Sequence, residues 1–223
     1  LIIRNAQIAN PDGSSFESDL ACNQGRIEKI APEISTDAVE QIDAEGHLLM
    51  PGVIDPQVHF REPGGDEREN LASGSRAAVR GGVTSFLEMP NCKPPTTDQE
   101  QLSWKIDRAS KTSVANFGFF IGATSGNLRS LNDAQLACGI KIFMGSSTGD
   151  LLVDDEKHLD QIFGNGSRLI AVHAEDETRI QDRTKSLLDG NENPDYSIHS
   201  VIRDPQTALI ATERALSLSK KYE

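Results

Sequence analysis

The chain has 223 residues, of which 37% are hydrophobic and 25% are charged, a composition typical of a globular protein and not of a disordered one. Its formal net charge of -12 at pH 7 opposes binding to nucleic acid or to an anionic membrane, because such a charge repels phosphates at range. The apolar runs are far shorter than the roughly 20 residues that span a bilayer, and Cys22, Cys92 and Cys138 are too widely spaced for a disulfide framework or a zinc knuckle. We therefore expect a soluble, cytoplasmic protein that binds neither nucleic acid nor membranes.

The first 50 residues have the pattern of a small β unit. Short strand-like runs are separated by the turn sequences PDG at 11–13 and NQG at 23–25. After residue 50 the pattern changes to apolar strands that alternate with helical stretches. We therefore expect one domain at 1–50 and a second at 51–223.

The second domain is predicted to contain right-handed βαβ units and a parallel sheet. We expect strands at 53–60, 84–89, 113–121, 139–144 and 168–173. Helices are expected at 70–80, 97–110, 131–137, 154–163, 175–188 and 204–222. Asp204 and Pro205 form a good N-cap and N1 pair for the last of these helices.

This α/β pattern favours a (β/α)8 TIM barrel over an open doubly wound sheet. The first strand is not followed by a glycine-rich phosphate loop, and polar residues of metal-binding type gather where strands end. In such a barrel the carboxyl ends of the strands form the active-site face, and about eight βα units fill roughly 250 residues. We expect about five of these units in this chain, so that it holds the first part of a barrel.

Four polar residues alternate along the first strand of this domain. Asp55, Gln57, His59 and Arg61 are spaced two apart, which predicts that they share one face of the strand. Polar side chains on the inner face of a parallel strand are costly unless they have partners. A metal and an anionic ligand would supply such partners; the alternative is an edge strand with one face in solvent.

The stretch PGVIDPQVHFREPG at 51–64 resembles the opening motif of dihydroorotases in the amidohydrolase superfamily. That family usually has Asp-x-His-x-His at this point, and the two histidines bind a divalent metal. His59 matches the second histidine, while Gln57 replaces the first. A glutamine oxygen is a poor substitute for imidazole on zinc. The resemblance also implies that residues 1–50 are the N-terminal part of a small β-sandwich.

Arg61 distinguishes among the substrates of such enzymes, because a guanidinium can hold a carboxylate through two hydrogen bonds. Hydantoinases and dihydropyrimidinases lack an arginine at this point. The second strand ends in MPN at 89–91, which is similar to the dihydroorotase motif whose asparagine helps to hold the same carboxylate. We expect Arg61 and Asn91 to bind the substrate.

Lys141 lies inside a strand that should be buried, where an isolated ammonium is strongly disfavoured. The stretch GIKIFMGSSTG at 139–149 resembles the family segment in which the lysine becomes a carbamate that bridges metals. The alternatives are a lysine that reaches solvent at the end of the sheet and one that pairs with an acid.

The fifth strand ends in HAED at 173–176, which is similar to the next metal-binding position of the family. The resemblance thus implies the metal ligands His59, Lys141 and His173, with Gln57 at the fourth position. Glu175 and Asp176 either orient the His173 ring or cap the helix that follows.

The resemblance implies a metal-activated water, one or two ions of zinc or, alternatively, of another divalent metal, and the reversible cyclisation of N-carbamoyl-L-aspartate to L-dihydroorotate in pyrimidine biosynthesis. The small-molecule substrate is therefore N-carbamoyl-L-aspartate or dihydroorotate, and we expect a homo-oligomer. The general base is expected beyond Glu223, so this chain alone should be inactive. The alternatives are a cyclic amidohydrolase of the hydantoinase, dihydropyrimidinase or allantoinase type and a non-catalytic homologue that acts as a scaffold.

Overall fold

The computed structural model describes residues 1–145, 151–165, 168–190 and 193–222. The chain splits into two compact units, Leu1–Gly52 and Val53–Glu223, and each is described by itself. Within the described residues, no helix combines the length and the apolar character that a membrane crossing needs.

The first unit is a mixed β-sheet. Its strands are β1 (Ile2–Ala9), β2 (Ser15–Asn23), β3 (Arg26–Ala31), β4 (Gln41–Asp43) and β5 (Leu48–Leu49). The order is β3-β2-β1-β4, with β5 also paired to β1; β2 is antiparallel to β1 and β3, whereas β4 and β5 run parallel to β1. Ala6, Ile8 and Leu20 form its small buried core. All strands described in this unit belong to one sheet, so the β-sandwich stays a prediction.

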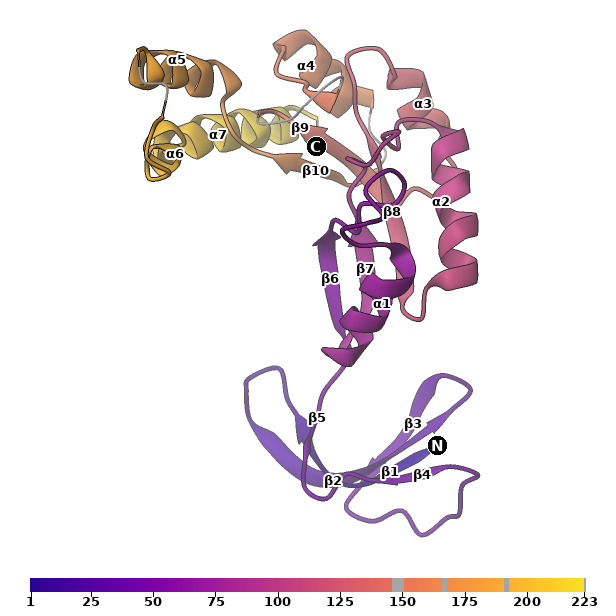
Figure 1. Ribbon diagram of the computed structural model, residues 1–223. Helices are drawn as coiled ribbons and strands as arrows, with labels where there is room; N and C mark the ends of the chain where they lie inside the picture. Colours follow the sequence, from indigo (N-terminus) through magenta and orange to yellow (C-terminus); the bar gives the residue numbers. More distant parts are fainter. Residues whose placement is uncertain (146–150, 166–167, 191–192, 223) are drawn as a thin grey trace. The chain divides into compact units, whose positions relative to one another are not determined.

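The second unit contains the expected parallel sheet with alternating helices, as Figure 1 shows. The sheet order is β10-β9-β8-β7-β6, and each neighbouring pair is parallel. The strands are β6 (Val53–Val58), β7 (Val83–Glu88), β8 (Asn116–Gly122), β9 (Gly139–Phe143) and β10 (Ile170–His173). Strands β6 and β10 are the two edges of this sheet, so the described residues do not close a barrel.

Seven helices are described in the second unit, and they follow the strands along the chain. They are α1 (Leu71–Arg80), α2 (Gln99–Thr112), α3 (Leu128–Asp133), α4 (Glu156–Asn165), α5 (Glu177–Leu188), α6 (Ile198–Ile202) and α7 (Pro205–Lys221). Four of them begin at an N-cap residue whose side-chain oxygen accepts a backbone N–H of the first turn. These N-cap residues are Asn70, Asp98, Asp176 and Asp204. The predicted Asp204 and Pro205 pair is therefore confirmed at the start of α7.

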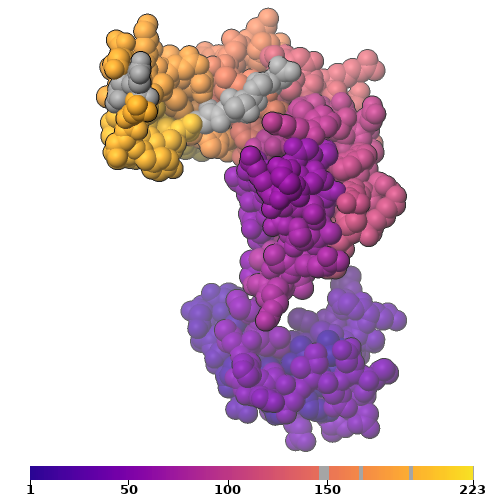
Figure 2. All heavy atoms as spheres, in the orientation of Figure 1, coloured from indigo at the N-terminus to yellow at the C-terminus, as the bar shows by residue number. Residues whose placement is uncertain are grey.

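The core of this unit is the apolar interior around the central strands. Every residue of β9 is buried, and apolar residues of β8 and β9 join Phe86 of β7 and Leu102 of α2 in one cluster. With all heavy atoms drawn, the segments around α1 and α2, in magenta to pink, form one closely packed body (Figure 2). Burial on both faces accounts for the continuous apolar runs of the central strands. The same packing fixes the strand ends, where the predicted site residues begin.

Two details of the predicted elements are wrong. The helix expected at 131–137 forms instead at Leu128–Asp133; the chain leaves the helical conformation at Ala134, where ψ is 129°, and Leu136 then adopts a left-handed φ of 66°. The short helix α6 is not among the expected elements; it has helical apolar spacing at Ile198, Val201 and Ile202 but is only five residues long.

Candidate active site

The candidate active site is formed by segments at the carboxyl ends of the parallel strands. His59 and Arg61 follow β6, Asn91 follows β7, Lys141 lies within β9 and His173 ends β10. Such strand ends carry the active sites of α/β barrels.

The expectation that four residues alternate along one strand face is wrong for two of them. Strand β6 ends at Val58, so His59 and Arg61 belong to the loop after it, and Arg61 has a left-handed φ of 66°. Within the strand, the Asp55 side chain accepts the amide N–H of Gln57 at 3.0 Å, and Gln57 is exposed. In the described sheet β6 is an edge strand, so burial does not explain the choice of polar residues at Asp55 and Gln57.

His59 and Asn91 are in direct contact. The Nδ1 atom of His59 lies 2.7 Å from the Oδ1 atom of Asn91. An amide oxygen can only accept, so Nδ1 carries the hydrogen and Nε2 keeps its lone pair. The contact therefore leaves Nε2 as the atom that could bind a metal, which is the arrangement that hydrogen bonds to metal-binding histidines usually enforce.

The surroundings of His59 keep its ring neutral. Burial lowers the pKa of His59; the bond to Asn91 opposes this effect, and the positive charges of Arg61, Lys141 and Lys105 lower the pKa further. A neutral imidazole is the form that binds metals. The charges also indicate that Lys141 lies within electrostatic range of this ring.

Lys141 is buried, with 1% of its surface exposed, on a strand that is buried throughout. Its ammonium lies 5.4 Å from the centre of the Phe143 ring, and none of the described carboxylates forms an ion pair with it. Burial lowers the pKa of Lys141. Within the residues that the structure describes, Lys141 neither reaches solvent nor pairs with an acid. Residues 146–149 of its motif lie outside the described residues.

His173 is bonded to an acid rather than to another predicted ligand. Its Nε2 atom lies 2.6 Å from Oε2 of Glu175, which also pairs with Arg203 at 2.5 Å. Its ring stacks on Phe143 with centroids 6.2 Å apart. Asp176 instead caps α5 by accepting the amide of Arg179 at 2.8 Å. Of the two roles considered for these acids, Glu175 thus contacts the ring and Asp176 caps the helix.

Arg61 and Asn91 line one pocket of about 170 Å³, together with Lys93 and Arg68. The loops after β6 and β7 are joined here by a 2.9 Å hydrogen bond from the amide of Lys93 to the carbonyl of Pro63. The pocket contains three cationic side chains and an amide, beside one acid, Glu67. Its chemistry suits a small anion such as a carboxylate.

The donor atoms fit a divalent metal in type. His59 offers a neutral Nε2, and Lys141 offers a buried amine that would bind as its carbamate. Among the described residues, however, no group of three or more His, Cys, Asp or Glu side chains is close enough together to hold a metal ion. A metal at this place would therefore need Lys141, and His173 would have to exchange its bond to Glu175.

Sequence reasoning missed a set of buried charges next to these residues. Glu62 follows Arg61 and Glu88 ends β7, and both are buried and paired with cations of α2, Arg108 and Lys105. The signal that could have found this set is a lysine and an arginine spaced three apart on a helix whose other inward residues are apolar.

Known proteins resemble the chain over most of its length. A family model described as dihydro-orotase-like matches residues 46–133. A dihydroorotase of Methanosarcina acetivorans is 36% identical over 99% of this chain and 48% of the relative. An allantoinase of Desulfitobacterium hafniense is 42% identical over 63% of this chain and 31% of the relative.

Solved structures agree with these relatives. The L-hydantoinase (dihydropyrimidinase) from Arthrobacter aurescens superposes with a TM-score of 0.91 at 29% identity, over 99% of this chain and 50% of that one. The chain therefore spans about half the length of the proteins that it matches. Relatives that cover nearly the whole chain, together with the family model, show that the chain belongs to the dihydroorotase-like family of cyclic amidohydrolases.

Proposed function

We propose that the protein carrying this chain is a dihydroorotase, which interconverts N-carbamoyl-L-aspartate and L-dihydroorotate in pyrimidine biosynthesis. The observation that carries this proposal is the pocket lined by the cationic Arg61 and by Asn91, whose amide oxygen contacts the His59 ring. A carboxylate is present in both compounds and absent from hydantoin. A substrate without a carboxylate would leave the Arg61 guanidinium without an anionic partner.

In this proposal the described residues bind and orient the substrate. The Arg61 guanidinium donates two hydrogen bonds to the carboxylate. Asn91 uses its oxygen for His59, so its NH2 group remains free to donate to the same carboxylate. The two residues would thereby place the amide of the substrate at a fixed distance from His59, which is the contribution of orientation to catalysis.

We also propose a divalent metal, with zinc as the expected ion, held by His59, Lys141 and His173, with Gln57 at the weaker position. When bound, the metal would polarise the amide carbonyl and lower the pKa of a water molecule. For Lys141 we propose the carbamate: the neutral amine would attack the carbon of CO2, an N–C bond would form as one C=O π bond opens to a carboxylate oxygen, and the nitrogen would release its proton to water. Burial favours the reactive neutral amine, because it lowers the pKa of Lys141, while a bound metal would balance the charge of the buried carbamate.

A second candidate is a cyclic amidohydrolase of the hydantoinase, dihydropyrimidinase or allantoinase type. The allantoinase relative is more identical to this chain than the dihydroorotase relatives, although over less of it, and a hydantoinase is the structure with a TM-score of 0.91. A third candidate is a scaffold without catalysis, favoured by the exposed Gln57 in place of a histidine.

The test is an assay of the full-length protein with L-dihydroorotate, hydantoin and allantoin, alongside Arg61→Met and the control Arg129→Met. Arg129 lies in α3, is almost fully exposed, pairs with Asp133 and does not line the pocket. We expect turnover of dihydroorotate that Arg61→Met abolishes and Arg129→Met preserves. Turnover of hydantoin or allantoin alone would favour the second candidate, and no turnover with no bound metal would favour the scaffold.

A further inference from the structure

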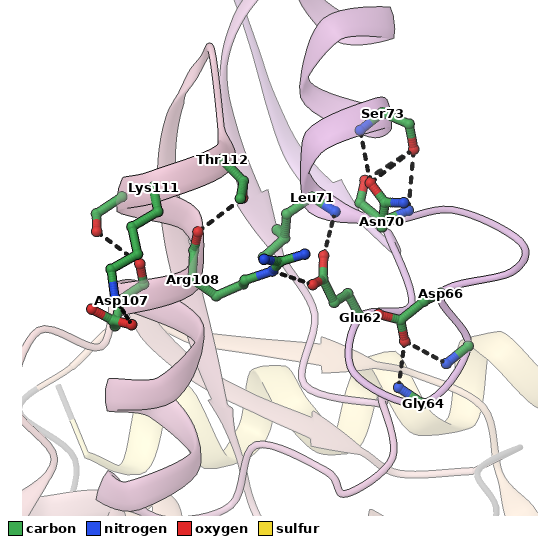
Figure 3. Close-up of polar contacts among 12 residues, drawn as sticks. Glu62, Gly64, Asp66, Asn70, Leu71, Ser73, Asp107, Arg108, Lys111 and Thr112 are labelled. Carbon is green, nitrogen blue, oxygen red and sulfur yellow. Dashed lines mark hydrogen bonds and ion pairs between the residues drawn. The ribbon is translucent and has the colours of Figure 1, made fainter.

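Helix α2 carries two cationic side chains, and each forms an ion pair with a buried carboxylate. Lys105 lies 2.7 Å from Glu88, and the Nε atom of Arg108 lies 2.5 Å from Glu62. Residues three apart share one face of a helix, so both cations point the same way. Figure 3 shows the Glu62 side chain between Arg108 and the first turn of α1, where it also accepts the amide of Leu71 at 2.8 Å.

These charges are deeply buried. Glu88 and Lys105 are each 1% exposed and Glu62 is 2% exposed, whereas Arg108 is 45% exposed. Lys105 also lies 5.0 Å from the centre of the Phe119 ring. Buried ion pairs add little net stability, because desolvation offsets their attraction. The hydrogen bonds in these pairs require a defined distance and direction, so the pairs constrain geometry more than they add stability.

Both carboxylates hold the short segment that carries two residues of the proposed site. Glu62 belongs to this segment and follows Arg61 directly. Glu88 is the partner of Val58 in the pairing of β7 with β6, so its carboxylate lies directly beside the start of this segment. Burial raises the pKa of Glu88, and the amide of Phe60 is among the donors that oppose this rise. The Phe60 ring packs edge-on against Phe86 with centroids 4.8 Å apart.

The Phe60 ring packs closely against α1. A Cβ atom added at Gly74 of α1 would lie 2.6 Å from the Phe60 ring. The partly buried Phe60 and the buried Glu62 are therefore both held against the body of the unit. His59 and Arg61 alternate with these two residues along the chain. His59 contacts Asn91, and Arg61 lines the anion pocket.

We propose that Lys105 and Arg108 are positioning residues: through Glu88 and Glu62 they hold residues 59–62 in the conformation that presents His59 and Arg61 to the site. That these ion pairs clamp residues 59–62, meaning that they hold this segment in one conformation, is inferred from the contacts alone. What His59 and Arg61 bind rests on the proposed function. Neither cation lines the pocket. Lys105 does lie beside it, with its Nζ atom 3.8 Å from Sγ of Cys92, which lines the pocket.

The first test compares Arg108→Gln with Lys111→Gln in the full-length protein. Lys111 lies one turn further along α2 and forms an exposed ion pair with Asp107. Lys111→Gln therefore serves as the control, since it removes a positive charge from the same helix without affecting Glu62. Hydrogen exchange of residues 59–70, zinc affinity by chelator competition, and KM and kcat for dihydroorotate are measured. We expect Arg108→Gln alone to speed exchange in residues 59–70 and to weaken zinc binding and raise KM by about 10-fold each, as loss of supporting contacts commonly does.

Two results would overturn the role of Arg108. One is a variant indistinguishable from Lys111→Gln in all three measurements. The other is faster exchange with unchanged zinc affinity and KM, which would make the ion pair merely structural. If the parent protein neither binds zinc nor turns over dihydroorotate, the proposed function fails, and exchange in residues 59–70 alone then decides whether the clamp exists.

A second pair of variants tests the route of the effect. If Arg108 acts through Glu62, the double variant Glu62→Gln/Arg108→Gln should be no worse than Glu62→Gln, whereas additive effects contradict this route. For Lys105, the charge-balanced variant Glu88→Met/Lys105→Met keeps the interior apolar and avoids an unpaired buried charge. We expect it to fold and to show faster exchange at residues 59–62 with weaker zinc binding; parent-like exchange and binding would overturn the role of Lys105.

Discussion

Asn91 accepts a hydrogen bond from Nδ1 of His59 at 2.7 Å, and this contact joins the loop after β6 to the loop after β7. It sets which ring nitrogen of His59 can bind a metal. It also brings together a residue expected to hold the metal and one expected to hold the substrate. Substitutions at Asn91 should separate these two roles.

Replacement of Asn91 by Asp or by Leu should have different effects. Asn91→Asp keeps an acceptor for His59 but adds a negative charge that repels a substrate carboxylate, so zinc affinity should be preserved while KM for dihydroorotate rises. Asn91→Leu removes the acceptor and should weaken zinc binding by about 10–100-fold. Chelator competition and steady-state kinetics measure the two effects; equal zinc affinity in both variants would contradict the orienting role of Asn91.

Removal of the buried charge at Lys141 should stabilise the metal-free protein. Lys141→Met deletes an ammonium that has no carboxylate partner among the described residues and whose pKa is lowered by burial, so that the charge is costly in the folded state. We expect urea unfolding to give a higher free energy for the variant at pH 7, together with loss of zinc binding.

The stabilisation by Lys141→Met should depend on pH in a defined direction. Because the folded pKa of Lys141 is lowered from 10.5, the unfolded chain binds more protons between the two pKa values, and the stability of the parent rises with pH in that window. The advantage of the variant should therefore shrink as pH approaches 10.5. An advantage that grows with pH would contradict the burial of an unpaired amine.

Breaking one partner of the Glu88 and Lys105 pair should destabilise the fold strongly. Glu88→Gln leaves the Lys105 ammonium buried without a counter-charge and should cost about 3–5 kcal/mol in urea unfolding. The exposed pair of Lys111 and Asp107 provides the control, since Asp107→Asn should cost less than about 1 kcal/mol. Equal losses of unfolding free energy in the two variants would contradict this prediction, and would show that water reaches the Lys105 ammonium once Glu88 is neutral.

Gln57→His should restore the family pattern of two histidines. Gln57 lies in β6, two residues before His59, and its side chain is exposed. If Gln57 occupies a proposed metal position, the histidine variant should bind zinc more tightly or bind a further ion. Metal analysis after dialysis measures the stoichiometry; an unchanged stoichiometry and affinity would exclude position 57 from the metal site.

The sheet was predictable from the sequence because its signals are local. Apolar runs marked the buried strands, and capping residues such as Asp204 marked where helices begin. The end of β6 at Val58 was not predictable, since the alternation of polar residues continues to Arg61, which has a left-handed backbone. The end of α3 at Asp133 was not predictable either, because Ala134 leaves the helical conformation without a glycine or proline to mark it.

The candidate site was predictable only as a set of residues. Motif resemblance selected His59, Asn91 and Lys141, but no pattern along the chain indicates that His59 contacts Asn91, 32 positions away. The pairing of Glu62 with Arg108 spans 46 positions and likewise depends on how α2 packs. Such contacts are consequences of the folded structure and leave no periodic trace in the sequence.

A substrate carboxylate anchored by Arg61 is central to the proposed function. The measurement that tests it most directly is kcat/KM of the full-length protein for L-dihydroorotate relative to hydantoin, before and after Arg61→Met. We predict a preference for dihydroorotate that falls by at least about 100-fold in the variant, since loss of a charged hydrogen-bonding partner costs roughly 3 kcal/mol. A preference for hydantoin that Arg61→Met leaves unchanged would contradict the anchoring role of Arg61.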